Sequence, residues 1–264
     1  MKKYFRALMP EMAYVQVESD FKMFLSMVDV SGPSFDLSYD KTKAFYQYEK
    51  TDKDLIEKHI ADGDVFLDVG ANIGHFSFYF KKKYPNLKCH LFEPIPWLGD
   101  CIQTTIEKNK ITDVEHHKVA LSDHSGDDEF FIDTFNDGGH SLLKDKVSKR
   151  GSTGKSVKVK LKTLDSYNFE KVDFMKVDVQ GAEKLFIQGA KQTIQKFRPK
   201  MLIEVSSKES LSFLKFLEKE TGISYEVFSS EKEGLLTEND LSSLVDIFSG
   251  KGIEDCNYLY VPKC

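Results

Sequence analysis

Two acidic residues and a glycine turn have the spacing of a nucleotide-binding edge in a parallel α/β sheet. In DVFLDVGANIGHFSFYF an apolar run ends at Asp68, Gly70 and Gly74 follow, and apolar residues resume at helical spacing. Glycine in a strand-to-helix turn lets the backbone approach a ligand closely and adopt positive φ. The next apolar run ends at Glu93, where an acidic residue can accept both hydroxyls of a ribose.

The spacing within this turn distinguishes between possible ligands. A dinucleotide fingerprint reads G-x-G-x-x-G, whereas this turn reads G-x-x-x-G and is preceded by the Asp68 carboxylate. A carboxylate at that point suits a cationic group better than a pyrophosphate. S-adenosylmethionine satisfies both Asp68 and Glu93, because it is a nucleoside that carries a cationic ammonium and a cationic sulfonium. A structural interpretation stays open, in which Asp68 caps the turn and Glu93 is an exposed strand end.

Three further side chains are candidates to remove a proton from an acceptor hydroxyl. Asp178 and Glu204 end two neighbouring apolar runs, and His140 lies in a long segment between the arms of a predicted hairpin. A positioned carboxylate or imidazole typically contributes about 10²–10⁴-fold to such a step. Structural roles stay open, since Asp178 could cap the helix that follows and His140 could be exposed to solvent. We interpret the His116-His117 pair as structural, because adjacent strand residues point to opposite faces.

A mostly parallel sheet with helices on both faces would position these residues. Strand-like runs alternate with amphipathic helices from about residue 52 onward, which is typical of that architecture. Helices are predicted around residues 98–106, and from a Thr237-x-x-Asp240 cap through Leu241, Leu244, Val245 and Phe248. The predicted strands are residues 65–69, 88–93, 114–121, 172–179, 200–205, 223–228 and 257–263, with a hairpin formed by 129–133 and 157–161.

The rest of the chain predicts one large enzyme-sized domain, residues 51–264, with an N-terminal cap or extension at residues 1–50. The cap is less regular and contains a Gly32-Pro33 turn.

A net charge of -5 and a pI near 5.9 disfavour a general nucleic-acid binder. The four cysteines form no CxxC pair and are interpreted as reduced thiols. Pro10 and Glu11 interrupt any leader-like start and no apolar run has membrane-spanning length, so we expect a soluble, cytoplasmic protein without membrane insertion.

Six separated blocks of the chain resemble the FkbM family of methyltransferases. They are VFLDVGANIGHFS, LFEP, VALSD, LKTLD, VDFMKVDVQGAEKLFIQGA and PKMLIEV, and the resemblance covers about residues 49 to 206. It implies the Rossmann-like class I methyltransferase fold, an α/β fold with a seven-stranded, mostly parallel sheet whose last strand runs antiparallel. It also implies methylation of a hydroxyl oxygen, often on a sugar of a surface glycan or of a glycosylated metabolite. Where most members read DVEG, this chain has Gln180, a neutral amide.

The resemblance also implies roles for individual residues. Strand four would end at Asp178, facing the transferred methyl group. Glu93, followed by Pro94, would bind the ribose. The methionine portion would lie against Asp68, Gly70, Ala71, Asn72, Gly74, Phe76 and Ser77, and the adenine against Ala120, Leu121 and Ser122.

The acceptor is expected to be a sugar or glycoconjugate. Residues 144–162 hold eight lysines and arginines, which could attract a phosphate-bearing acceptor, although a solvated hairpin is the other interpretation. A divalent cation held by Asp178 and Glu204 is an alternative means of lowering the pKa of the acceptor hydroxyl. The oligomeric state is left open.

Other functional classes predict different features. A base-modifying methyltransferase would carry Asn/Asp-Pro-Pro-aromatic where this chain has DVQG. A nicotinamide-dependent dehydrogenase would show the third glycine of its fingerprint. A non-catalytic cofactor-binding or scaffold protein, which would bind the cofactor without turnover, and a methyltransferase for a non-sugar small molecule both remain alternatives.

Overall fold

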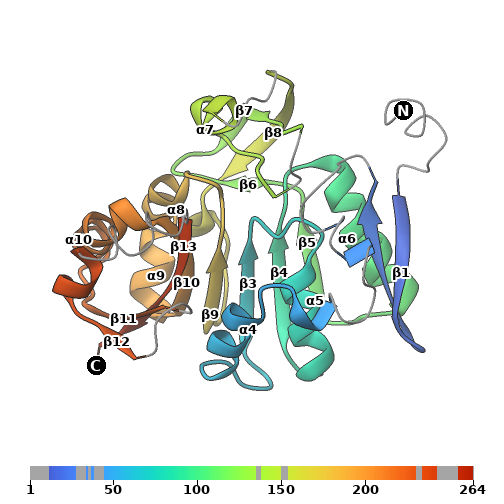
Figure 1. Cartoon of the computed structure of the whole chain (residues 1–264), viewed down its shortest axis with the longest axis horizontal. Coiled ribbons are helices and arrows are strands. Elements are labelled where there is room, and N and C mark those ends of the chain that lie inside the picture. Colours follow the sequence, from blue (N-terminus) through green and yellow to red (C-terminus); the bar gives the residue numbers. More distant parts are fainter. Residues whose placement is uncertain are drawn as a thin grey trace.

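The computed structural model describes residues 12–27, 34, 37–38, 45–134, 138–149, 154–229, 234–242 and 255–263. Its centre is an eight-stranded sheet with helices packed on it (Figure 1). In spatial order the strands are β12 (Leu235–Leu236), β11 (Tyr225–Ser229), β13 (Asp255–Pro262), β10 (Lys200–Ser206), β9 (Phe174–Val177), β3 (Val65–Val69), β4 (Lys88–Phe92) and β5 (Val114–His117).

The strand directions agree with the predicted fold, but the strand count does not. Strands β5, β4, β3, β9 and β10 pair in parallel, and β13 is inserted antiparallel between β10 and β11. The antiparallel last strand is therefore confirmed. The eighth strand is β12, a two-residue strand that pairs antiparallel with β11 at the edge, and its short length explains why the sequence did not indicate it.

Helices cover both faces of the sheet, so the central strands are buried on both sides. All five residues of β3 are buried, as expected for a parallel strand between two helical layers. One core cluster joins the sheet to α4 (Lys50–Glu57), α5 (His75–Lys83) and α6 (Pro96–Asn109). The other joins it to α8 (Glu183–Gly189), α9 (Lys191–Phe197) and α10 (Ser210–Thr221). The 3-10 helix Leu164–Ser166 connects β8 to β9, and the 3-10 helix Ser207–Glu209 connects β10 to α10.

A small three-stranded sheet lies beyond the carboxyl ends of the central strands (Figure 1). It consists of β6 (Ala120–Leu121), β8 (Ser156–Lys162) and β7 (Gly126–Phe131), accompanied by helix α7 (Lys144–Lys149). The predicted hairpin is confirmed, since β7 and β8 pair antiparallel. The single strand expected at 114–121 is wrong, because the chain turns after β5, where the Val119 amide donates to the His117 carbonyl, and β6 then pairs with β8.

The described part of residues 1–50 includes a hairpin that packs on the main domain. Strand β1 (Met12–Glu18) pairs antiparallel with β2 (Phe21–Ser26), and β2 lies against α6. The Phe24 amide donates to Thr105 Oγ1 at 3.0 Å. Buried residues of β2 belong to the same core cluster as α5 and α6. The Gly32-Pro33 turn lies outside the described residues.

The predicted cap at Thr237 is present. The Thr237 hydroxyl and amide donate to Asp240 Oδ2 at 2.7 and 2.8 Å, and the Asp240 amide donates back to Thr237 Oγ1 at 3.1 Å. The helix is described over residues 238–242, and Leu244, Val245 and Phe248 lie outside the described residues. In the part of the chain that the structure describes, no helix combines the length and apolar character needed to cross a membrane.

Candidate active site

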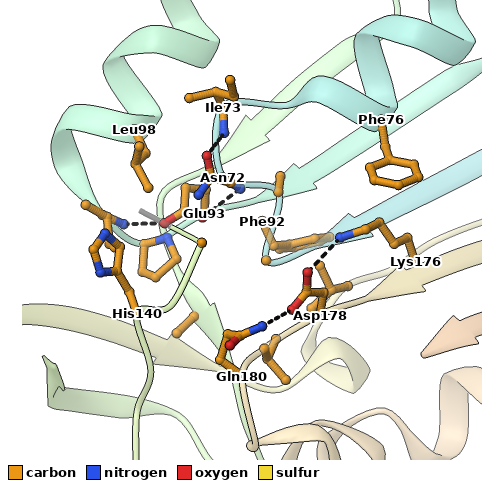
Figure 2. Close-up of a pocket in the computed structure, with 18 of the residues that line it drawn as sticks. Asn72, Ile73, Phe76, Phe92, Glu93, Leu98, His140, Lys176, Asp178 and Gln180 are labelled. Carbon is orange, nitrogen blue, oxygen red and sulfur yellow. Dashed lines mark hydrogen bonds and ion pairs between the residues drawn. The ribbon is translucent and has the colours of Figure 1, made fainter. Parts of the chain in front are cut away.

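A cavity of about 390 Å³ opens where β3, β4, β9 and β10 end, and residues of the small sheet also line it. Figure 2 shows several of the side chains that line it. Its volume lies within the range of small-molecule sites. It brings together predicted residues from six separate segments. Those that line it are Gly70, Ala71, Asn72, Phe76, Glu93, Pro94, Ala120, Leu121, His140, Asp178 and Glu204.

The glycine turn forms one wall of the cavity, and its shape requires glycine. Gly70 has φ 76°, and its amide donates to the Phe92 carbonyl at 3.0 Å. A Cβ at Gly70 would lie 1.9 Å from the Asp178 carbonyl oxygen, so a side chain cannot fit without moving backbone. The turn is thus pressed against the end of β9, and its backbone borders the cavity directly.

Glu93 lies at the end of β4 and holds its carboxylate at the cavity. Its Oε2 accepts the Asn72 amide and its Oε1 accepts the Ile95 amide, both at 2.9 Å (Figure 2). Burial raises the pKa of Glu93 to about 8, despite these two hydrogen bonds. When the group is ionised, each oxygen has two lone pairs, so both oxygens can accept a further hydrogen bond from a ligand; when it is protonated, as a pKa of about 8 implies near pH 7, one oxygen donates instead.

Four residues that were predicted to contact the cofactor do not line the cavity: Asp68, Gly74, Ser77 and Ser122. Asp68 is 1% exposed, and its Oδ2 accepts the Ser77 hydroxyl at 2.7 Å behind the glycine turn. Gly74 precedes α5 and would meet Phe78 and Leu91 if it carried a Cβ. Ser122 is buried, with its amide bonded to the Lys162 carbonyl. These four residues support the cavity walls from behind.

Lys176 is the buried cation of the site. Its Nζ lies 3.3 Å from Asp178 Oδ2 and 4.9 Å from the centroid of the Phe76 ring (Figure 2). Burial alone would lower the pKa of Lys176, but the charges of Asp178, Asp68, Glu49 and Glu204 outweigh it and raise that pKa. The ammonium therefore stays charged and balances carboxylates from several elements.

Gln180 joins the two strand-end carboxylates. Its Nε2 donates to Asp178 Oδ1 at 2.8 Å and to Glu204 Oε2 at 2.5 Å. Burial alone would raise the pKa of Asp178, but Lys176, Glu204 and Gln180 together hold it below its usual range. Protein donors thus satisfy both carboxylates, and this arrangement gives no support to a divalent cation between them.

His140 is buried rather than exposed. It is 6% exposed, and its Nδ1 accepts the Asp133 amide at 2.9 Å. Burial lowers the pKa of His140 to about 4, so the ring is neutral near pH 7. Figure 2 places this ring on the Glu93 side of the cavity, away from Lys176 and Asp178.

The sequence did not lead us to predict two residues of the site, Lys176 and Glu49. A lysine within the otherwise apolar run that forms β9 is a signal that could have identified Lys176, because lysine is almost never fully buried without a partner. Glu49 lines the cavity just before α4, with φ 48° and a pKa that burial raises to about 7. No local pattern marks it, and it falls within the segment predicted as a cap.

Comparisons with known proteins show the family to which the chain belongs. Residues 68–227 match the methyltransferase FkbM domain. The chain is 30% identical over 149 residues to "Methyltransferase 1" of Beauveria bassiana (strain ARSEF 2860), and 31% identical over 152 residues to "Methyltransferase sdnD" of Sordaria araneosa. The matches cover 48% and 47% of this chain, and 59% of each relative, so the chain spans less than two thirds of their length.

A solved structure shows the same fold. The crystal structure of the FkbM methyltransferase from Methylobacillus flagellatus KT matches with a TM-score of 0.51 at 13% identity, over 76% of this chain and 44% of that one. The domain match itself covers more than half of the chain. The chain therefore belongs to the FkbM methyltransferase family.

Proposed function

We propose that this protein is an S-adenosylmethionine-dependent O-methyltransferase that acts on a hydroxyl of a sugar or glycoconjugate. The observation that carries the proposal is that the Gly70 turn and the Glu93 carboxylate border one cavity, which Asp178, Glu204 and Glu49 also line. Ligands of open α/β sheets bind at the carboxyl ends of the strands, which is where this cavity lies.

The residues present fit S-adenosylmethionine. The Gly70 turn offers backbone that a ligand can approach, and Glu93 offers two carboxylate oxygens to the ribose hydroxyls. Leu98 and Leu121 supply apolar surface for the adenine. The cofactor, when bound, supplies the electrophilic methyl group of its sulfonium. Asp178 has its pKa held low and is therefore an anionic partner for the cationic amino-acid portion.

The acidic side of the cavity favours an acceptor rich in hydroxyl groups. Asp178, Glu204 and Glu49 all line it, and ionised carboxylates accept hydrogen bonds but donate none. The lysine-rich strand β8 gives less support to a phosphate-bearing acceptor, because Lys158 and Lys160 lie directly opposite Glu129 and Asp127 of β7. We therefore favour an acceptor that is uncharged at the reacting sugar.

Glu49 is the best placed base for the acceptor proton. Asp178 and Glu204 are occupied by Gln180, and a carboxylate with a lowered pKa is a weak base. Among the described residues, none makes a hydrogen bond or ion pair with the Glu49 carboxylate, and its pKa of about 7 is matched to proton transfer near neutral pH. In this scheme Glu204 orients the acceptor, Asp178 faces the amino-acid portion of the cofactor, and His140 lies on the cofactor side.

The test combines cofactor binding with methyl transfer. Calorimetry with S-adenosylmethionine and its demethylated product measures binding, and labelled cofactor with a panel of glycans measures transfer. We expect Glu93→Gln to weaken cofactor binding, and Glu49→Gln to lose transfer while it keeps cofactor affinity. Glu107→Gln, on the outer surface of α6, is the control for both.

The outcomes separate the competing functions. Binding without transfer to any hydroxyl compound would favour a non-catalytic cofactor-binding protein. Transfer to a non-sugar compound alone would overturn the acceptor assignment, and failure to bind either cofactor form would overturn the proposal as a whole.

A further inference from the structure

A cluster of metal-ligating side chains lies outside the cavity, on two neighbouring strands. His90 belongs to β4, and Glu115 and His117 belong to β5, the edge strand of the sheet. The parallel register places His90 opposite Glu115 and Phe92 opposite His117. Since side chains alternate between faces along a strand, all four share one face. His116 points to the other face, against Gly99, so pairing between strands, not adjacency in sequence, brings two histidines together.

The ligand atoms of this cluster are close enough to share one ion. His90 Nδ1 lies 3.2 Å from His117 Nε2 and 3.5 Å from Glu115 Oε2. One ligand atom from each of the three side chains lies within 4.8 Å of the other two. In a tetrahedral zinc site with Zn–N of about 2.0–2.1 Å, two ligating nitrogens are about 3.3 Å apart. The spacing of the two imidazole nitrogens therefore already suits such an ion.

Aromatic rings hold the two imidazoles in place. The His117 ring lies parallel to Phe92, with centroids 4.6 Å apart, and Tyr167 meets it edge-on at 5.2 Å. Phe169 meets the His90 ring at 5.0 Å. These ring contacts limit ring motion, so only a small rotation separates the two imidazoles from the geometry of an ion site. The Glu115 side chain is 64% exposed, so an ion has a path from solvent.

A hydrogen bond between the imidazoles is the competing interpretation. The two ring planes differ by 20° and the centroids lie 5.5 Å apart, so the rings meet edge to edge with the nitrogens facing one another. Burial lowers the pKa of both rings, that of His117 to about 4, so two neutral imidazoles share one N–H between them. A metal ion would take the place of that proton after a modest rotation of the rings, and the proton would move to the other nitrogen of the same ring.

We propose that His90, Glu115 and His117 bind a divalent transition-metal ion such as Zn²⁺, at a site separate from the methyl-transfer cavity. Two imidazoles and one carboxylate suit zinc or cobalt, whereas calcium and magnesium prefer oxygen ligands. The fourth position is left for water. The ion would join edge strand β5 to β4 next to Phe92, which also lines the cavity. Its role is therefore to stabilise this wall of the cavity.

Zinc titration of the full chain after treatment with a chelator tests the proposal. We expect one equivalent to bind and the unfolding temperature to rise. Substitutions His90→Asn and His117→Asn should each weaken zinc binding by more than the roughly 10–100-fold that loss of an outer-shell partner costs. Glu115→Gln, at an exposed side chain, should weaken binding without affecting folding. His124→Asn is the matched control, because His124 is an exposed histidine that pairs with Asp123 elsewhere.

A second measurement needs no substitution and so avoids any folding defect in the variants. Long-range ¹H–¹⁵N spectra of the wild-type protein report each of its seven histidine rings. Zinc should shift the ring-nitrogen signals of two histidines. Those His90→Asn and His117→Asn variants that fold should lack these signals, which assigns the signals to His90 and His117. Absence of stoichiometric binding, or shifts of other rings alone, would establish the imidazole pair as a hydrogen bond only and overturn the proposal.

Discussion

Lys176 in β9 lies directly opposite Asp68 in β3, in the parallel pairing of the two central strands. Because side chains alternate between the faces of a strand, Asp178 falls on the same face two residues later. Glu204 shares that face too, since Leu202 of β10 pairs with Lys176. One register thus gathers a single buried ammonium and three carboxylates at the end of the sheet, where the cavity opens.

Substitution of Lys176 tests this charge balance. Lys176→Met should lower the free energy of unfolding by about 3–5 kcal/mol at pH 7, because it leaves buried carboxylates uncompensated. Those carboxylates would then have raised pKa values in the folded state, so the loss should shrink toward pH 5 and grow toward pH 8. Urea unfolding followed by circular dichroism at both pH values measures this difference.

A surface lysine provides the control for that experiment. Lys171 also pairs with two carboxylates, Asp64 and Asp173, but its side chain is 51% exposed. Lys171→Met should cost about 1 kcal/mol or less. Equal losses in the two variants would contradict a special role for the buried cation.

Alanine substitutions at three glycines distinguish the cost of backbone strain from the cost of steric contact. Gly70→Ala combines a positive φ with a Cβ only 1.9 Å from the Asp178 carbonyl oxygen. It should destabilise the fold severely and abolish cofactor binding. Gly63 has φ 92° but open space, so Gly63→Ala should cost only the roughly 1 kcal/mol of the strained conformation. Gly126→Ala, with neither feature, should be nearly neutral. Thermal unfolding and calorimetry would rank the three, and a mild Gly70→Ala would contradict the tight approach.

Gln180→Glu tests the amide that joins Asp178 and Glu204. The variant places a third carboxyl where an N–H donor stood, so the pKa values in this cluster should rise in the folded state. The free energy of unfolding should then fall more at pH 8 than at pH 5. Gln103→Glu is the control, because Gln103 also donates to a carboxylate, Glu107, but on an exposed helix face. A loss that does not depend on pH would point to altered packing instead.

Glu49 should make stability depend on pH. Its pKa is raised from 4.5 to about 7 by burial in the folded state, so its contribution to stability is full below pH 4.5 and is lost as pH rises through 7. Glu49→Gln removes this titration. The variant should therefore gain stability relative to wild type between pH 5 and pH 8, measured by urea unfolding. A constant difference across that range would show that Glu49 titrates normally.

The sequence predicted the local elements of the site better than their convergence. Residue type and local spacing mark the strand before Gly70, the turn itself and Glu93. The structure confirms the turn, and both Gly70 and Glu93 line the cavity. The contacts of Gln180 and Glu49 depend on which strands become neighbours and where α4 docks. The strand expected at 114–121 was wrong for a similar reason, because β6 finds its partner in β8, some forty residues later.

The insertion of β13 has a consequence for how the chain is made. Strands β10 and β11 do not pair with each other, and both take their hydrogen bonds from residues 255–262. During synthesis on the ribosome, β10 therefore emerges long before its partner and waits as an open edge that could join another chain. Chaperone binding to nascent chains should be strongest in this interval, and it should end once β13 leaves the exit tunnel.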